Sequence, residues 1–387
     1  MEIIFNLFKS LQMAFYMFWD VLWPLILGFT LSGAVQAVVS HKKMAETLGD
    51  DSPKSYALAA FFGTASSSCS YAATALARSI FRKGATFTSA MVFEMASTNL
   101  VIELGVILIV LMGWQFMASE FLGGIIMVIL LALIFRFTLT RKMIRVAREN
   151  AEKGITGKME GHAAMDMSVP GKSLFSRLFS GRGFTAISHY FIMDWASVWI
   201  DILIGFIIAG ILAVFVPNSF WQAFFFKNNP TIAFIEGPLI GPLVAIFSFV
   251  CSVGNVPLAA VLWKGGISFG GVVSFIFADL IVLPILDIYR KYYGWKMMLY
   301  ILTTFYITMV LAGYIVEILF SALNIIPTQR NIEVMTSGIA MNYTSVLNIV
   351  FLALAVILLI RFFRTGGPAM LKEMEKPPEE IKDCCKT

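Results

Sequence analysis

Two cysteines lie far apart in the chain but in similar polar surroundings. Cys69 lies within Thr-Ala-Ser-Ser-Ser-Cys-Ser (residues 64–70), and Cys251 begins Cys-Ser-Val-Gly-Asn-Val-Pro (residues 251–257). A thiolate binds soft cations and metalloids well, and neighbouring hydroxyl and amide groups can bind the polar part of a solute. The candidate binding residues are Cys69, Cys251, Ser66, Ser67, Ser68, Ser70, Ser252 and Asn255. The alternative is that each cysteine is a small buried residue at a helix crossing.

Acidic residues in otherwise apolar stretches form a second group of candidates. Glu94 and Asp279 follow the two cysteine segments, and a carboxylate at bilayer depth is costly and usually faces the interior of a helix bundle. We expect them to bind solute or to exchange a proton. The other candidates for a polar pathway are Ser97, Thr98, Asn99 and Glu103. For the hydroxyl groups, the alternative is a hydrogen bond to their own helix backbone.

The composition indicates that these residues belong to a membrane protein. Of 387 residues, 58% are apolar or aromatic and only 14% are charged, whereas a soluble domain carries about 25% charged residues. Uncharged runs long enough to cross a ~30 Å hydrocarbon core recur along the chain. They are residues 21–40, 55–77, 202–226, 237–263, 297–316 and 334–360. The sequence therefore predicts an all-α polytopic membrane protein with about eight to ten membrane segments.

The chain contains an internal repeat. The segment that begins at Val21 recurs from Val198 and pairs Gly28 with Gly205. The segment from Cys69 recurs from Cys251, and an alignment with one gap pairs Lys83 with Lys264 and Gly84 with Gly265. Two matches in the same order indicate two related halves, which are typical of secondary transporters.

Basic residues predict how the halves are oriented. Residues 141–183 hold nine Lys or Arg, and the positive-inside rule places such a linker in the cytoplasm. If each cysteine segment is a re-entrant hairpin, nearly all other basic clusters also become cytoplasmic, with Lys264 as the exception. The two halves are then antiparallel, which makes an inverted repeat. The alternative is a kinked but complete span over residues 55–80.

We therefore expect five parts in a multi-pass protein of a prokaryotic inner membrane. They are a first membrane repeat (1–140), a basic cytoplasmic linker (141–186), a second membrane repeat (187–326), an additional transmembrane helix (327–364) and a charged cytoplasmic tail (365–387). No cleavable signal peptide is expected, because the first apolar run is too long and lacks a small-residue cleavage site.

Several classes of function are disfavoured. The positive charge lies in loops rather than on an aromatic-interleaved surface, so no nucleic-acid partner is expected. The sequence shows no phosphate-binding loop, its three histidines are dispersed, and neither a cofactor, nor a resident metal, nor enzymatic activity is expected. The expected partners are a small-molecule or metalloid solute and membrane lipid, with a homo-oligomer left open. A membrane thiol redox protein that cycles Cys69 and Cys251 is an alternative, although there is no Cys-x-x-Cys motif.

The residues also resemble a known family. Thr64–Ser70 and Arg82–Asn99 are similar to the signature of the predicted-permease family that includes the organoarsenical efflux permeases. The resemblance covers residues 15–325 and implies a multi-spanning permease. In the family, known or proposed substrates include trivalent organoarsenicals and, in some branches, soft metal ions.

The chain departs from this signature at three positions. Ser67 stands where the family has its first motif cysteine, Ala65 stands for the usual proline, and Thr98 stands where proline is common. Only a pair formed across the halves, by Cys69 and Cys251, is then left to chelate a soft centre. We expect a secondary-active permease that exports a thiophilic solute by alternating access with proton coupling. The alternative within this class is a different small anionic or organic solute.

Overall fold

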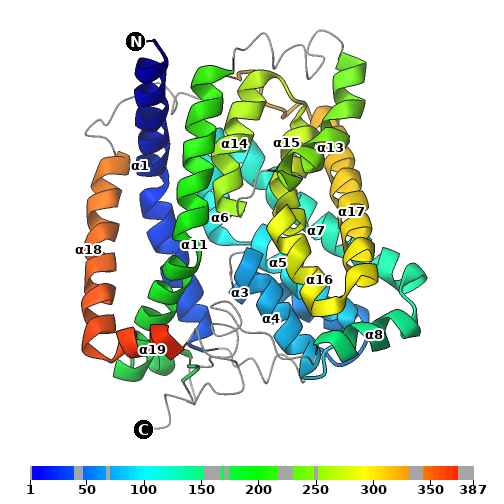
Figure 1. Cartoon of the computed structure of the whole chain (residues 1–387), viewed down its shortest axis with the longest axis vertical. Helices are drawn as coiled ribbons and strands as arrows, with labels where there is room; N and C mark the ends of the chain where they lie inside the picture. Colours follow the sequence, from blue (N-terminus) through cyan, green and yellow to red (C-terminus); the bar gives the residue numbers. More distant parts are fainter. Residues whose placement is uncertain are drawn as a thin grey trace.

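The computed structural model describes residues 2–38, 47–66, 70–151, 167–169, 174–216, 230–247, 252–330 and 343–373 (Figure 1). The helices up to residue 151 are α1 (Glu2–Gln36), α3 (Pro53–Ser66), α4 (Ser70–Arg82), α5 (Phe87–Asn99), α6 (Ile102–Met112), α7 (Trp114–Thr138) and α8 (Arg141–Ala151). Those that follow are α10 (Leu174–Leu178), α11 (Gly181–Phe215), α13 (Pro230–Ile246), α14 (Ser252–Gly265), α15 (Phe269–Phe277), the 3₁₀ turn η1 (Ala278–Ile281), α16 (Leu283–Tyr293), α17 (Trp295–Ala322), α18 (Tyr343–Arg364) and α19 (Gly367–Glu373).

The predicted all-α polytopic membrane protein is confirmed. Four helical stretches in the described residues are long and apolar enough to cross a membrane, and a fifth is added if the pair bent by 42° at residue 282 counts as one span. The four are Phe87–Met112, Trp114–Thr138, Trp295–Ala322 and Thr344–Arg364. The first two were not among the uncharged runs, because Glu94, Glu103 and Glu120 interrupt them. The total of eight to ten segments stays a prediction.

The gapped alignment of the second repeat match is wrong. Gly84 and Gly266 are the residues with positive φ, +120° and +119°, just after α4 and α14, and each follows its cysteine at the same distance along the chain. Gly84 therefore matches Gly266 rather than Gly265, and Lys83 does not match Lys264. No gap is needed, and the two cysteines keep their pairing.

The N-caps of the next helices follow the corrected register. Thr86 and Ser268 are the N-caps of α5 and α15, and each hydroxyl accepts a hydrogen bond from the backbone N–H three residues on, which satisfies an otherwise unpaired donor. Gly113 and Gly294, with φ of +103° and +86°, separate α6 from α7 and α16 from α17. Gly113 lies 29 residues after Gly84 and Gly294 lies 28 residues after Gly266, so matching this pair requires a one-residue gap between the two glycine pairs. Glycine is suited to both junctions because it adopts positive φ without a steric penalty.

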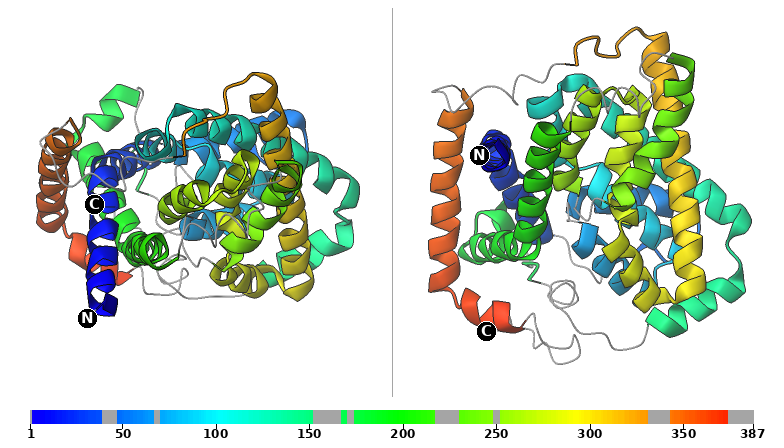
Figure 2. Two further views of the ribbon diagram at one scale, coloured as in Figure 1. Left: turned by 90° about the horizontal axis from the view of Figure 1, so that it is seen from above. Right: turned by 45° about the horizontal axis from the view of Figure 1, so that its top comes forward.

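The matching elements occupy opposite parts of the molecule. In Figure 1, α1 begins at the top and runs downward, whereas α11 runs beside it and ends at the top. Helices α3 and α4 lie in the lower part, and α13 and α14 lie in the upper part, as the right-hand view of Figure 2 also shows. An inverted repeat would have this arrangement. Residues 67–69 and 248–251, where the predicted hairpins turn, lie outside the described residues, so re-entrance stays a prediction.

Helix α8 lies within the predicted linker, where the sequence showed little helical pattern. It packs under α4 and α16: the Arg78 guanidinium donates to the Ala151 carbonyl at 2.9 and 3.1 Å, and the Asn150 amide donates to the Tyr293 carbonyl at 3.2 Å. The Arg148 guanidinium lies 4.4 Å from a phenylalanine ring of α4. Tertiary contacts therefore stabilise a helix that its own apolar pattern did not predict.

Close packing of α1 against α11 depends on small residues. A Cβ at Gly33 would lie 2.9 Å from the Ile187 carbonyl oxygen, and one at Gly210 would overlap the Ser10 carbonyl oxygen. Small residues let membrane helices approach closely.

Gly210→Leu is expected to lower the free energy of unfolding by about 1–3 kcal/mol through overpacking, measured by thermal unfolding in detergent. The control is Leu203→Phe on the same helix, at a half-exposed position; equal unfolding temperatures for the two variants would contradict this packing.

Candidate polar site at the helix breaks

Glu94 lies at a junction of three helices. It is fully buried on α5, and its Oε1 accepts hydrogen bonds from the Thr74 hydroxyl on α4 and the Tyr289 hydroxyl on α16, both at 2.6 Å. Thr74 comes from the first half and Tyr289 from the second. The carboxylate thus connects the two halves inside the bundle.

Asp279 occupies a break in the second half. Helix α15 ends at Phe277, η1 follows, and Pro284 lies in the first turn of α16, where its missing N–H costs nothing. Asp279 is fully buried on η1, and the Ser70 hydroxyl donates to its Oδ2 at 2.5 Å. The Ser252 side chain also lies near this carboxylate.

The two serines link Asp279 to both cysteine segments. Ser70 is the first residue of α4 and Ser252 is the first residue of α14, so they directly follow Cys69 and Cys251 in the chain. The start of α4 therefore contacts this buried carboxylate, and the start of α14 lies near it. The candidates Ser67, Ser68, Cys69 and Cys251 themselves lie outside the described residues.

A third buried acid was missed from the sequence. Glu120 on α7 is 1% exposed, and neither carboxylate oxygen has a hydrogen-bond partner among the described residues. It is close enough to Asp279 for their charges to interact. Four residues further along α7, a Cβ at Gly124 would overlap Leu100, the C-cap residue of α5. The sequence could have identified Glu120 as a candidate, because it is the only charged residue between positions 114 and 135.

The three acids leave unpaired oxygens in a buried region. Glu94 Oε2 and Asp279 Oδ1 also lack a hydrogen-bond partner among the described residues. An ionised carboxylate buried without a partner costs several kcal/mol, so such a group requires a proton or a cation. Within the described part of the chain, no three His, Cys, Asp or Glu side chains are placed to hold a metal ion. The arrangement therefore suits proton exchange or hydrogen bonding to a solute.

The polar run after Glu94 is bonded to its own helix. The Ser97 hydroxyl donates to the Glu94 carbonyl at 2.9 Å, and the Asn99 amide donates to the Met95 carbonyl at 3.1 Å. The Thr98 hydroxyl likewise donates to the Met95 carbonyl, at 3.3 Å. These contacts match the alternative considered from the sequence, and a role in a polar pathway stays a prediction.

The structure also describes three of the remaining candidates. Ser66 ends α3 and donates to the Gly63 carbonyl at 3.0 Å, and Asn255 is fully buried on α14. Glu103 lies in the first turn of α6 and packs against Gly28 of α1. A further buried acid, Glu317 on α17, accepts a hydrogen bond from the Ser268 hydroxyl at 2.9 Å, next to the N-terminus of α15.

Phenylalanine substitutions at two neighbouring tyrosines distinguish the contribution of one hydrogen bond from that of ring packing. Tyr289 and Tyr293 are both buried on α16, but only the Tyr289 hydroxyl has a partner, Glu94, among the described residues. Tyr289→Phe is expected to lower the free energy of unfolding by about 1–3 kcal/mol, because it removes a hydrogen bond to a buried acid. Tyr293→Phe is the control and is expected to be neutral. Equal losses in thermal unfolding experiments would argue against the bond to Glu94.

Comparisons with known proteins identify relatives over most of the chain. The sequence profile of the predicted-permease family matches residues 6–318. The Mycobacterium tuberculosis (strain ATCC 25618 / H37Rv) protein named "Putative permease Rv2963" is 56% identical over 347 residues, which cover 89% of this chain and 86% of that protein. No solved structure matches the chain.

Proposed function

Since the chain belongs to the predicted-permease family, we propose that it is a secondary-active permease that exports a small thiophilic solute by alternating access, coupled to protons. Membership of the family and the apolar helices already indicate a multi-pass membrane transporter rather than an enzyme. The solute class, the direction and the coupling ion are the proposal. The convergence that carries it is the hydrogen bond from Ser70 of α4 to Asp279 of η1, with Ser252 at the start of α14 nearby.

This convergence supports a solute site formed by both halves. Ser70 donates to Asp279 and Ser252 lies near it, and in the chain these serines directly follow Cys69 and Cys251. One thiol from each half would bind a soft centre such as a trivalent arsenical. A site shared between halves is suited to alternating access, because relative movement of the halves opens it to either side.

The three buried acids support the coupling. Glu94, Asp279 and Glu120 lie in one polar region, and each has at least one oxygen without a partner among the described residues. Buried carboxylates in membrane bundles mark proton relays in pumps and transporters. In the proposed cycle, release of the solute and uptake of a proton occur at this region.

The basic residues support the proposed orientation. Arg82, Arg290 and Arg361 lie in the last turns of α4, α16 and α18, and these ends lie with α8 in the lower part of Figure 1. We assign this side to the cytoplasm of a prokaryotic cell by the positive-inside rule. The assignment makes the halves an inverted repeat with re-entrant cysteine segments.

Transport into inverted vesicles tests the proposal. With a trivalent organoarsenical as the probe, Cys69→Ser and Cys251→Ser are each expected to lower the initial rate of uptake at least about tenfold, which corresponds to about 1.4 kcal/mol of lost interaction. The control is Cys384→Ser with Cys385→Ser in the C-terminal tail, which is expected to keep the wild-type rate. Full activity of both single variants would contradict the thiol site, and a redox-dependent Cys69–Cys251 crosslink without transport would favour the redox alternative.

A further inference from the structure

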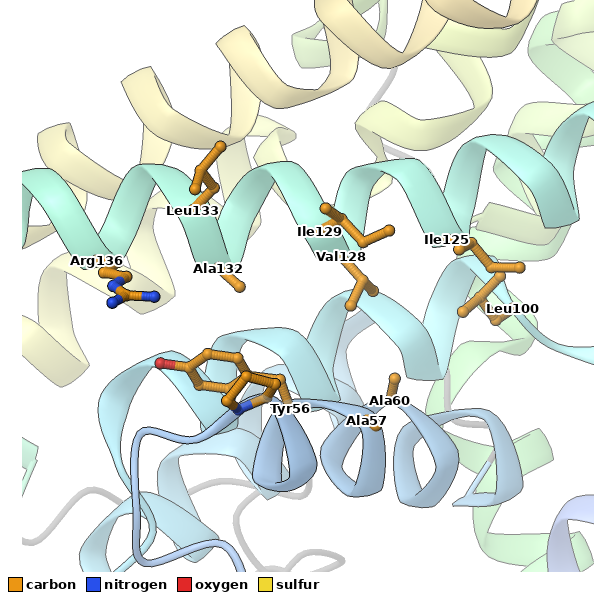
Figure 3. Close-up of a pocket in the computed structure, with 11 residues that line it drawn as sticks. Tyr56, Ala57, Ala60, Leu100, Ile125, Val128, Ile129, Ala132, Leu133 and Arg136 are labelled. Carbon is orange, nitrogen blue, oxygen red and sulfur yellow. The ribbon is translucent and has the colours of Figure 1, made fainter.

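A groove runs along the outside of the first half between α3 and α7. It has a volume of about 500 Å³, and its walls are apolar except at one end. Figure 3 shows Ala57 and Ala60 of α3 facing α7, with Ile125 at one end of the row along α7 and Arg136 at the other. The Tyr56 ring lies at the same end as Arg136. The groove is therefore amphipathic along its length.

The groove opens on the lipid-facing side of α7. Ile125, Ile129 and Leu133 line it and are 52%, 61% and 49% exposed. The Arg136 side chain makes no ion pair with any residue that the structure describes. An unpaired guanidinium next to an apolar groove is suited to a ligand with an acidic head and a hydrocarbon tail.

The corresponding place in the second half is closed. Counting from the Gly-Trp junctions that begin α7 and α17, Tyr306 matches Ile125 and Tyr314 matches Leu133. The Tyr306 hydroxyl donates to the Leu239 carbonyl of α13 at 3.0 Å, and the Tyr314 hydroxyl donates to another α13 carbonyl. These rings bridge α17 to α13, whereas the aliphatic residues of α7 leave the groove open.

Counted from the same Gly-Trp junctions, the residue at the charged end of the groove also differs between the halves. Arg136 matches Glu317, which accepts a hydrogen bond from Ser268 at the start of α15. The second half thus uses this position for an internal contact, and the first half leaves a cation at the surface. The open groove and its arginine belong to one half only, so the repeated scaffold does not require them.

We propose that this groove binds an anionic phospholipid of the surrounding membrane, with one acyl chain between α3 and α7 and the phosphate on Arg136. From Ile125 to Arg136, α7 rises ~16 Å at 1.5 Å per residue, which is close to one leaflet of a ~30 Å hydrocarbon core. Arg136 lies near the end of α7, next to the basic helix α8. Guanidinium binds phosphate through paired hydrogen bonds, and anionic lipids collect at basic membrane-flanking sites.

Native mass spectrometry of the purified full-length protein tests the headgroup. With phosphatidylglycerol and phosphatidylcholine of identical acyl chains, wild type is expected to retain phosphatidylglycerol preferentially. Arg136→Ala is expected to reduce this preference about fivefold, and Arg136→Lys is expected to restore most of it. Arg364→Ala, at the end of α18, is the matched control with no expected effect. Equal retention of phosphatidylglycerol by wild type and Arg136→Ala would overturn the proposal, as would competition by free glycerol phosphate at the lipid concentration.

Closing the groove tests the acyl chain. The double variant Ile125→Tyr with Leu133→Tyr copies the second half and is expected to lose retention of both lipids while its helical content stays at the wild-type level. Leu133→Val leaves the groove open and is expected to retain phosphatidylglycerol. If the tyrosine pair instead dissociates a dimer and lipid retention is unchanged, the groove binds a second copy of the chain and the lipid proposal is wrong.

Discussion

Asp279→Asn is expected to lower proton-driven transport by about 10- to 100-fold. Asp279 is buried and accepts a hydrogen bond from Ser70, with Ser252 also nearby. A hydrogen bond to a charged group contributes about 1.5–3 kcal/mol, and each 1.4 kcal/mol is a factor of ten. The amide cannot exchange a proton, and it offers one acceptor oxygen where the carboxylate offers two. The initial rate of transport in proteoliposomes with an imposed pH gradient measures the effect.

Asp287→Asn is the control for this prediction. Asp287 is also in the second half, but it is half-exposed on α16 and pairs with Arg290 at 2.6 Å and Lys291 at 2.8 Å. Exposed ion pairs contribute little to stability, so the variant is expected to transport at the wild-type rate. A similar loss in both variants would mean that Asp279 has no special place in the transport cycle.

The inward orientation of the two predicted acids could be inferred from their apolar surroundings in the sequence. Glu94 and Asp279 stand in apolar surroundings along the chain, and a carboxylate facing lipid would cost too much free energy to persist. Their inward orientation follows from composition alone. Their partners do not, because Tyr289 reaches Glu94 from a helix 195 positions along the chain and Thr74 from the preceding helix, and only the packing of α4 and α16 brings them together.

The one-residue error in the repeat alignment came from matching lysines by identity. An alignment based on residue identity favoured Lys83 with Lys264 and therefore inserted a gap, whereas backbone conformation pairs the two glycines of positive φ. In the corrected register Asp279 matches Ser97, and Glu94 matches Ile276. Each half thus contributes an acid that the other lacks. In the predicted repeat, Glu94 and Asp279 are therefore two different carboxylates at non-equivalent positions.

Glu120 shows what burial without a partner implies for transport. If this acid exchanges a proton in the proposed cycle, Glu120→Gln is expected to abolish stimulation of transport by a pH gradient, a loss of at least about tenfold, while downhill exchange of solute continues. Glutamine has nearly the same shape but cannot ionise. Because neither oxygen of Glu120 has a partner among the described residues, the variant is expected to be as stable as wild type or more stable.

The stability measurement distinguishes Glu120 from Glu94. Glu94→Gln weakens two hydrogen bonds, from Thr74 and Tyr289, and is expected to lower the free energy of unfolding by about 1–3 kcal/mol. Ser119→Ala, next to Glu120 and equally buried, is the control for local disturbance of α7. A Glu120→Gln variant that unfolds as readily as Glu94→Gln would show that Glu120 is a structural acid. One that keeps full stimulation by the pH gradient would remove it from the coupling pathway and leave Glu94 and Asp279 to carry the proton.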